Sequence, residues 1–517
     1  MRRNSYIVAL FVVLCGFISG PLVAQDNDHD RGALPLIAYQ QGSSHKLEQV
    51  IGDCDWTLYD PQPTANPPGP VGPCKPTTSQ TITRFQVMAN GFGYSFEHNG
   101  KLIFLFGDTV GGMTGTSPPT SIDYHAGDPM AWSTTRNGKD GLLISFFMKP
   151  DGTPLFDQPS PQPDRLQPSG IAPGAKVLMG ADDIANSGIS LNGQAYLIVN
   201  TNADETLNDP HLRAFSVLVK FDETTGTFTG GRTISQSYYP LPPHDKPVGM
   251  PGHFVFTAMH EYWPGVGPWG GDRWDDSGPQ EPAVLIFGNG QYRASSLYLS
   301  YVPVSEFWSG MDEQGNNATR YFTGLTDGHP TWSQNESDAK PLFYDNPTNL
   351  DTTSSDPGTV GNVSVTYSRG LDLWLMTYDG GRQLQDTTGV YFTYAREPWG
   401  PWATPQLIFN ACHDHGYGKF IYYYHPSMTP APCPALPSGS GPAGPIIGAG
   451  QNTSGPNGPF GTGAFTKAGG PFAPQLIGRF TEVEGDTLRI YYNLSTFNPY
   501  TVVKMSSEFT ITDTHSH

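Results

Sequence analysis

The sequence contains little cysteine and little charge, and basic residues are especially scarce. The 517 residues include 5 cysteines, and charged residues make up 15% of the chain. With 28 Lys and Arg against 47 Asp and Glu, the formal net charge is −19. An acidic surface repels phosphate backbones and anionic lipid head groups, which excludes nucleic-acid or membrane-surface binding through basic patches.

Long hydrophobic runs are also missing. A membrane-spanning helix needs roughly 20 consecutive apolar residues, and the longest such run, Tyr6–Phe17, is shorter. This run follows Arg2 and Arg3 and precedes the small residue Ala24, a pattern typical of an export signal. We therefore predict a signal peptide over residues 1–24, a secreted protein that is extracellular or periplasmic, and no membrane span.

The cysteines outside this signal fall into two local pairs. Cys54 and Cys74 flank a proline-rich stretch, and Cys412 and Cys433 flank a loop rich in histidine, tyrosine and proline. Because disulfides persist in exported proteins, we predict one disulfide within each pair. A metal site of cysteine and histidine is the alternative, but the closely spaced cysteines of such sites are missing. We predict no metal and no cofactor.

Glycine and proline, by contrast, are abundant. The 61 glycines and 49 prolines form about a fifth of the chain, well above the roughly 12% of average usage. Both residues are unfavourable inside helices and common in turns, and no long segment shows the 3.6-residue periodicity of a helix. With 37% hydrophobic residues to form a core, the composition predicts an all-β fold with many turns.

The clearest internal repeat consists of two hairpins, Asn90–Thr109 and Asp183–Thr201. Each has an Asn-Gly pair, at 99–100 and at 192–193, between two β-rich runs. Asn-Gly favours a two-residue hairpin turn because both residues tolerate positive φ. Counting back nine residues from each turn gives Asn90 and Asp183, so the two hairpins have an amide and a carboxylate at the same place.

Three further hairpin-like units follow, and together the five units predict a five-bladed β-propeller. A β-sandwich or a solenoid is the alternative, because the spacing of the units is irregular. Residues 25–80 are predicted to form an N-terminal extension with one disulfide, and residues 81–517 the propeller domain. Segments 111–180 and 430–474 are rich in Gly, Pro, Ser and Thr and are predicted to be long loop insertions. The additional units are Glu281–Pro303, Val363–Tyr378 and Ile477–Ser495.

Four of these segments resemble successive signatures of one family. The resemblance is to DUF4185, a group of exported five-bladed propellers that includes glycoside hydrolase family 183, endo-acting D-arabinanases that cut arabinofuranose polymers with inversion. It spans roughly Gln80–Phe509 and implies the propeller fold and a carbohydrate substrate. The four segments are GYSFEHNGKLIFLFGDT (Gly93–Thr109), GNGQYRASSLYLSYVP (Gly288–Pro303), GNVSVTYSRGLDLWLMTYDGG (Gly361–Gly381) and LSTFNPYTVVKM (Leu494–Met505).

The chain departs from this family pattern at two positions. Asn90 stands where such sequences usually have an acid before the first blade strand, and Asn362 stands where many have the glutamate of Gly-Glu-x-Ser. Both changes replace a carboxylate by an amide. An amide binds a hydroxyl or a water but cannot accept its proton.

Two carboxylates are predicted to be catalytic, because glycoside hydrolysis uses one acid and one base or nucleophile across the scissile bond. Asp108 ends the apolar run LIFLFGD, where partial desolvation raises a carboxyl pKa. Asp183 is the second candidate, and its neighbour Asp182 is expected to tune its pKa by repulsion. The structural alternatives are a turn cap at Asp108 and a solvated pair at 182–183.

The predicted substrate-binding residues are Asn90, Asp182, His260, Glu261 and Arg293. His260 and Glu261 precede Tyr262 and Trp263, and aromatic planes beside charged groups are typical of sugar subsites. A rim loop that packs on its own tryptophans is the structural alternative.

The sequence thus predicts a secreted glycoside hydrolase acting on a furanose-containing polysaccharide or oligosaccharide, arabinan-like in type. The alternative is a non-catalytic glycan-binding or cell-surface propeller that has lost its base at Asn90.

Overall fold

The architecture comes from a computed structural model of the chain. No helix among the residues that it describes is both long and apolar enough to cross a membrane. The described residues are 34–55, 75–111, 128–148, 184–202, 213–236, 252–264, 277–290, 292–293, 295–343, 358–381, 388–414, 416–417, 420–421, 470–497 and 500–512.

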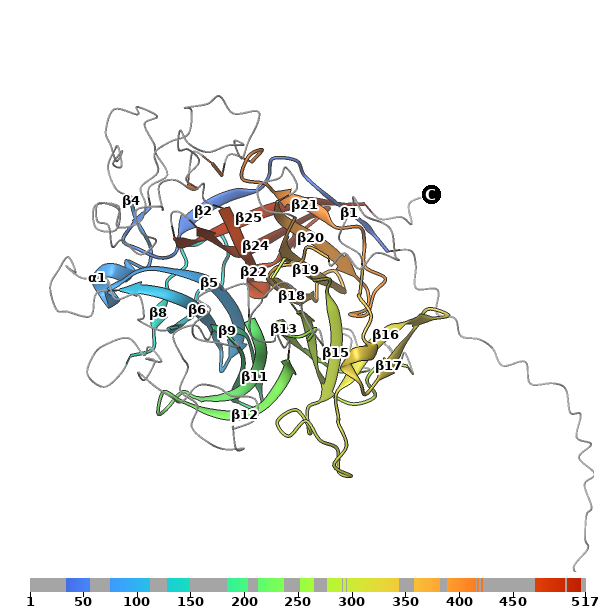
Figure 1. Cartoon of the computed structure of the whole chain (residues 1–517). Coiled ribbons are helices and arrows are strands. Elements are labelled where there is room, and N and C mark those ends of the chain that lie inside the picture. The colour runs from blue at the N-terminus through green and yellow to red at the C-terminus, as the bar shows by residue number, and fades with distance from the viewer. Residues whose placement is uncertain are drawn as a thin grey trace, which may run out of the picture.

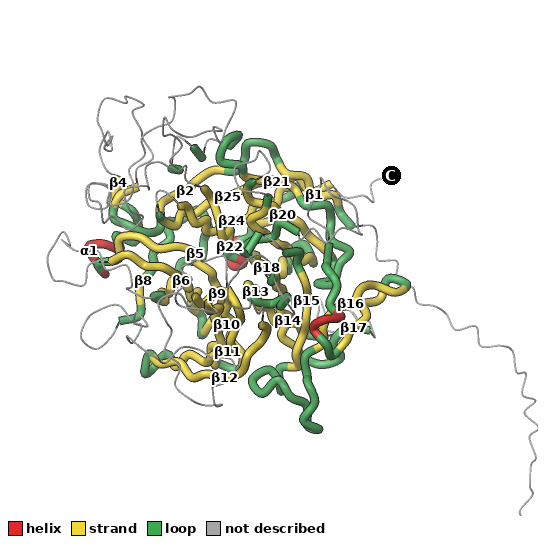
Figure 2. The backbone as a smooth tube through the Cα atoms, in the orientation of Figure 1, coloured by secondary structure: helices red, strands yellow, loops and turns green. Residues whose placement is uncertain are grey.

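Strands dominate these residues, and helical turns are few and short (Figure 2). Five antiparallel sheets follow one another in chain order around an axis (Figure 1). The first sheet consists of β5 (Val87–His98), β6 (Lys101–Gly111), β7 (Met130–Ser133) and β8 (Ser145–Phe146); the second consists of β9 (Ile184–Leu191), β10 (Gln194–Asn202), β11 (Arg213–Asp222) and β12 (Thr227–Gln236).

The third sheet has five strands, and the fifth includes strands from both ends of the described chain. The third consists of β13 (Phe256–Tyr262), β14 (Ala283–Asn289), β15 (Tyr298–Pro303), β16 (Arg320–Thr326) and β17 (His329–Ser333); the fourth of β18 (Val363–Ser368), β19 (Leu373–Gly380), β20 (Gly389–Ala395) and β21 (Gln406–Phe409); the fifth of β22 (Gly470–Leu476), β23 (Glu482–Glu484), β24 (Thr487–Phe497), β25 (Thr501–Thr512), β1 (Leu36–Tyr39) and β2 (His45–Gln49).

The innermost strands close a ring. β5 contacts β9, β9 contacts β13, β13 contacts β18, β18 contacts β22, and β22 returns to β5. This closed circuit of five inner strands confirms the predicted five-bladed β-propeller. The remaining short elements lie between or beside the blades: β3 (Cys54–Asp55), β4 (Lys75–Pro76), α1 (Thr81–Phe85), η1 (Glu336–Asp338) and η3 (Gly478–Phe480).

The two Asn-Gly hairpins form as predicted. Asn99 and Gly100 have φ values of 47° and 77°, and the pair at 192–193 has 51° and 78°. Positive φ at both turn residues matches the twist of the flanking strands. One detail differs: β5 begins at Val87, so Asn90 lies inside the strand instead of ahead of it.

Among the described residues the core has five large hydrophobic clusters, one between each pair of neighbouring blades, and a small sixth cluster of Ala89 and Tyr500. Alternate side chains of β14 enter different clusters: Val284 and Ile286 face the second blade, whereas Leu285 and Phe287 face the fourth. Successive side chains of a strand point to opposite faces, and here both faces are covered. The second strand of a blade is therefore a continuous apolar run.

The two predicted loop insertions are wrong in part. Segment 111–180 contains β7 and β8, the outer strands of the first blade, and segment 430–474 contains the start of β22. These strands are short, or contain glycine and proline, and so lack the alternation by which a strand is read from sequence.

The N-terminal residues 36–49 complete the fifth blade, because β1 and β2 both pair with β25. A buried ion pair reinforces this junction: Lys504 Nζ lies 2.7 Å from Glu48 Oε1. The amide of Leu142 in the first blade donates to the same oxygen at 2.6 Å. The predicted disulfides stay predictions, since Cys74 and Cys433 lie outside the described residues.

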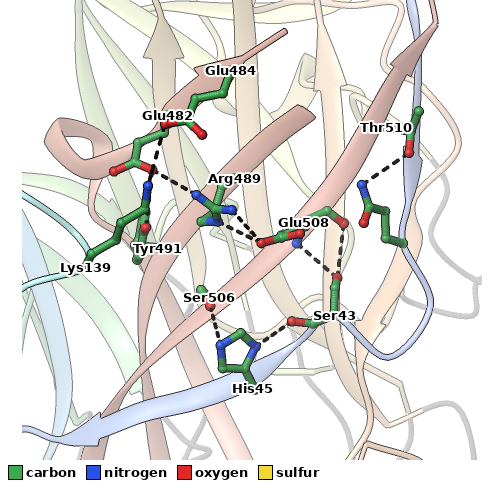
Figure 3. Close-up of polar contacts among 11 residues, drawn as sticks. Ser43, His45, Lys139, Glu482, Glu484, Arg489, Tyr491, Ser506, Glu508 and Thr510 are labelled. Carbon is green, nitrogen blue, oxygen red and sulfur yellow. Dashed lines mark hydrogen bonds and ion pairs between the residues drawn. The ribbon is translucent and has the colours of Figure 1, made fainter. Parts of the chain in front are cut away.

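Charged side chains also connect the fifth blade to the loop between β7 and β8 (Figure 3). Arg489 lies between two carboxylates, with Nη1 3.1 Å from Glu482 and Nη2 2.7 Å from Glu508. Lys139 reaches Glu482 at 3.2 Å. These ion pairs are half-buried or exposed to solvent and contribute little individually, so the closure of the fifth blade depends mainly on strand pairing and buried contacts.

Tyr500 makes one of those buried contacts, and Gly91 is the residue that permits it. The Tyr500 hydroxyl donates to Gly107 O at 3.2 Å, and a Cβ on Gly91 would overlap that hydroxyl. Gly91→Ala is therefore expected to lower the free energy of unfolding by about 1 to 3 kcal/mol through overpacking, measured by urea denaturation. Gly470→Ala is the matched control, because no atom of the described residues lies within 4 Å of its added Cβ.

Removing the hydroxyl provides the converse test of this contact. In the Gly91→Ala/Tyr500→Phe double variant, most of the lost stability is expected to return, since the atom that overlaps the new methyl group is gone. A double variant that is less stable than Gly91→Ala alone would contradict the assigned contact.

His253 lies at the interface of the second and third blades and is expected to make the stability of the fold depend on pH. Its ring stacks on Tyr298 with centroids 3.9 Å apart, and burial lowers its pKa from 6.5 to about 4. Between these values the unfolded chain binds the proton and the folded chain does not, so stability falls as pH drops from 6.5 to 4. The free energy of unfolding is expected to fall by up to about 3 kcal/mol. Urea denaturation at several pH values measures this loss.

Glu336, at the same interface, has the opposite effect on stability as pH falls. It accepts a hydrogen bond from the His253 amide at 2.6 Å, and burial raises its pKa, so the folded state takes up this proton first as pH falls. His253→Phe, which retains an aromatic ring, is expected to flatten the acid limb, whereas Glu336→Gln is expected to steepen it. An unchanged slope in His253→Phe would contradict the assignment.

Candidate functional site

Polar residues occupy the end of the propeller where the inner strands begin. The second strands of four blades carry Asp108, Asn200, Asn289 and Asp379 near their ends. Strand pairing sets each of these beside the start of its inner strand: Asn200 lies opposite Ile184, Asn289 lies opposite Phe256, and the Asp379 amide donates to Asn362 O at 3.2 Å. We call the set Asn90, Asp108, Asn200, Asn289, Asn362 and Asp379 the axial ring.

Asp379 is the most heavily bonded member of the axial ring. Its Oδ2 accepts from the Tyr292 hydroxyl and from Arg293 Nε, both at 2.8 Å. Its Oδ1 accepts from the backbone amides of Asn362 at 2.7 Å and Ala473 at 3.2 Å. These donors come from the third, fourth and fifth blades, so one buried carboxylate fixes three blades relative to one another.

Arg293 adopts an unusual backbone conformation to make this contact. Its φ is 52°, a region that residues other than glycine rarely occupy. The guanidinium also donates to Pro471 O at 3.1 Å, and burial raises the pKa of Tyr292 well above its usual value. The structure pairs Arg293 with Asp379, and the predicted role of Arg293 in substrate binding stays a prediction.

Asn90 lies on the most irregular part of an inner strand. The register of β5 against β6 shifts three times between Val87 and Tyr94, and such bulges redirect side chains, commonly beside active sites. The Asn90 side chain is 0% exposed, and neither of its polar atoms has a hydrogen-bond partner among the described residues. Its amide thus has one acceptor and two donor hydrogens that pair with no described residue.

Aromatic residues follow Asn90 on the same strand. Phe92 and Tyr94 stack with centroids 5.5 Å apart, and Phe472 meets Phe92 edge-on at 5.6 Å. The Tyr94 hydroxyl donates to Asn362 Oδ1 at 2.5 Å, which links the first blade to the fourth. Phe92 and Phe472 are only partly buried. The axial ring therefore has both hydrogen-bonding amides and an aromatic wall.

The structure places the predicted catalytic residues as follows. Asp108 lies on β6, and pairing of Gly107 with Gly91 and of Val110 with Ala89 sets its backbone opposite Asn90. Its side chain lies outside the described residues, as do Asp182 and Asp183. Asp183 directly precedes Ile184, the first residue of β9. The roles predicted for these three aspartates therefore stay predictions.

His260 and Glu261 are not brought to the axial ring. They occupy the end of β13, whereas the start of β13, at Phe256, pairs with Asn289 of the ring. His260 Nδ1 donates to Glu261 O at 2.7 Å, and its Nε2 accepts from the Tyr367 amide at 3.4 Å. Burial lowers the pKa of His260. The roles predicted for His260 and Glu261 in substrate binding stay predictions.

Asp379 was missed by the sequence predictions, although the signal that selected Asp108 also marks it. Asp108 ends LIFLFGD and Asp379 ends LWLMTYD, and each run is the second strand of its blade. An acid at the end of such a run lies next to the inner strand and the axis. Applied to every blade, this rule would have found both.

No group of three or more His, Cys, Asp or Glu side chains in the described part of the chain is arranged to hold a metal ion.

Comparison with known families matches residues 77–506 to the family described as "Domain of unknown function (DUF4185)". The chain belongs to the DUF4185 family. This membership confirms the resemblance identified from the sequence motifs and covers the five blades described above. A comparison with curated proteins finds no match.

Several solved structures are similar in fold. A protein from Bacteroides ovatus ATCC 8483 is 12% identical with a TM-score of 0.41, covering 83% of this chain and 87% of that one. Endo-1,5-alpha-L-arabinanase from Thermotoga petrophila RKU-1 is 9% identical with a TM-score of 0.36, covering 83% and 74%. A family-43 glycoside hydrolase from Bacillus licheniformis is 9% identical with a TM-score of 0.34, covering 81% and 71%. Likenesses this distant do not indicate which activity the present chain has.

Proposed function

We propose that this DUF4185 protein is a secreted glycoside hydrolase that cuts a furanose-containing polysaccharide of the arabinan type. Asp108 and Asp183 are the proposed carboxyl pair, Asp182 tunes Asp183, and Asn90 binds a sugar hydroxyl. Arg293 acts through Asp379, which it holds in place.

The observation that carries this proposal is the combination found at the axial ring. Asn90, a buried amide that pairs with no described residue, stands two positions before Phe92 on β5, and the partly buried ring of Phe92 meets that of Phe472. Sugars present a face of C–H groups that packs on aromatic rings and hydroxyls that pair with amides and carboxylates. Asp108 lies on the strand opposite Asn90, which supports its role as one member of the carboxyl pair.

A second function is favoured by the two amides. Asn90 and Asn362 both belong to the axial ring, and Asn362 already accepts a hydrogen bond from Tyr94. If they stand where a base is required, the site binds a glycan without cutting it. Hydrolysis requires two carboxyl groups roughly 5 to 10 Å apart across one pocket, whereas binding requires none.

Product release separates the two functions. The purified mature protein, residues 25–517, is incubated with arabinan, arabinogalactan and, as a control, a glucan that contains no furanose. Soluble oligosaccharides released over time are separated by chromatography. We expect products from the furanose-containing polymers and none from the glucan. Retention on an arabinan affinity gel without any products would replace the hydrolase by the glycan-binding propeller.

A further inference from the structure

Trp263 is an exposed tryptophan at the mouth of the propeller opposite the axial ring. It directly follows β13, and its side chain is 52% exposed. Most large aromatic side chains of the chain are packed into the five clusters, so a half-exposed indole is an exception. No ring of a described residue stacks on it.

The orientation of this indole is fixed. Trp263 Nε1 donates to Glu261 Oε2 at 3.0 Å, and Tyr262 between them packs against Trp399 with centroids 5.8 Å apart. The ring is thus set in one orientation before any ligand arrives, which reduces the ordering cost of binding. Exposed Arg369, which lies close enough to His260 to lower its pKa, adds donors near this mouth.

We propose that Trp263 is a second carbohydrate-binding site, on which a sugar ring of the polysaccharide stacks while Glu261 holds the indole. The ligand is of the same class as in the proposed function, on which this inference rests. An exposed flat ring with a charged hydrogen-bond partner beside it suits the C–H face and the hydroxyls of a saccharide.

The distance between the two sites determines which substrates bind more tightly because of Trp263. β13 runs from the axial ring at Phe256 to Tyr262, and its seven residues span roughly 20 Å at the usual rise per residue. A short oligosaccharide in the axial ring does not reach Trp263. The path over the surface between the two mouths is longer than this straight span, so only a long polymer reaches both sites, and a second contact on one chain raises its overall affinity through effective concentration.

The test compares polymer and oligomer with four variants of the full mature protein. Trp263→Ala is expected to weaken retention on arabinan in affinity electrophoresis about tenfold, the change that one stacking contact gives, with hydrolysis of short arabino-oligosaccharides as the second readout. Leu325→Ala, another exposed apolar side chain of the third blade (40% exposed), is the matched control and is expected to bind like the wild type.

Two variants of Glu261 distinguish the effect of the Trp263 ring orientation from the effect of the carboxylate charge. Glu261→Gln retains an oxygen that accepts the indole N–H and is expected to bind polymer nearly as the wild type does. Glu261→Ala releases the ring and is expected to bind less well.

The outcomes distinguish failure of the second binding site from failure of the hydrolase proposal. Wild-type retention in Trp263→Ala overturns the second site, whether or not products form. Equal losses on polymer and on short oligosaccharides also overturn it, because they place Trp263 in the axial site or show that the variant is misfolded. Retention of the wild type without any product overturns the hydrolase but leaves the Trp263 comparison valid.

Discussion

Asp379→Ala is expected to lower the free energy of unfolding by about 3 to 5 kcal/mol, the usual cost of removing one partner of a buried ion pair. The Arg293 side chain is 12% exposed and that of Asp379 is 1% exposed, so the guanidinium left behind would be buried without its carboxylate. The Tyr292 hydroxyl and the amides of Asn362 and Ala473 would lose the same acceptor. Urea denaturation at pH 7, with an unchanged m value, measures this loss.

Two control variants separate the charge from the hydrogen bonds. Tyr292→Phe removes one neutral donor and is expected to cost about 1 kcal/mol. Lys139→Ala removes an exposed partner of Glu482 and is expected to cause no measurable change. Asp379→Ala with stability near that of Tyr292→Phe would show that Arg293 finds water or another acceptor, and Asp379 would then not be the fixed point of three blades.

The fold was predictable from sequence where its determinants are local. The Asn-Gly turns at 99–100 and 192–193 and the apolar second strands are encoded by neighbouring residues, and both formed as expected. The closure of the fifth blade was not predictable, because β1 pairs with β25 across nearly the whole chain. No periodicity within a segment specifies its distant partner.

The candidate site divides in the same way. The pattern of an acid at the end of an apolar strand, which selected Asp108, also marks Asp379. The sequence could not show that His260 and Glu261 lie at the other end of an inner strand from the axial ring, because the start and the end of an inner strand lie at opposite mouths of the propeller. Placing a residue at one mouth or the other requires the bounds of β13, which the preceding Gly- and Pro-rich sequence does not mark.

Asp108→Asn is expected to reduce hydrolysis of arabinan by about a thousandfold, within the range attributed to one positioned acid or base. The substitution retains shape and removes the ionisable proton, so binding to an arabinan gel is expected to persist. Asp183→Asn is expected to cause a similar loss, and the double variant little more, because members of a catalytic pair act as a unit. Initial rates of product release, with thermal unfolding to confirm folding, provide the measurement.

Asn90→Asp decides whether the wild-type chain already has its base. If Asp183 serves, a carboxylate at position 90 adds a second acid opposite Asp108, buried and close to a like charge, and both effects raise its pKa. The variant is then expected to hydrolyse arabinan more slowly than the wild type, with its pH optimum moved. If products instead appear only in Asn90→Asp, then Asn90 stands in place of a lost base, and the natural protein is a glycan-binding propeller whose axial ring retains all but one of the groups that hydrolysis needs.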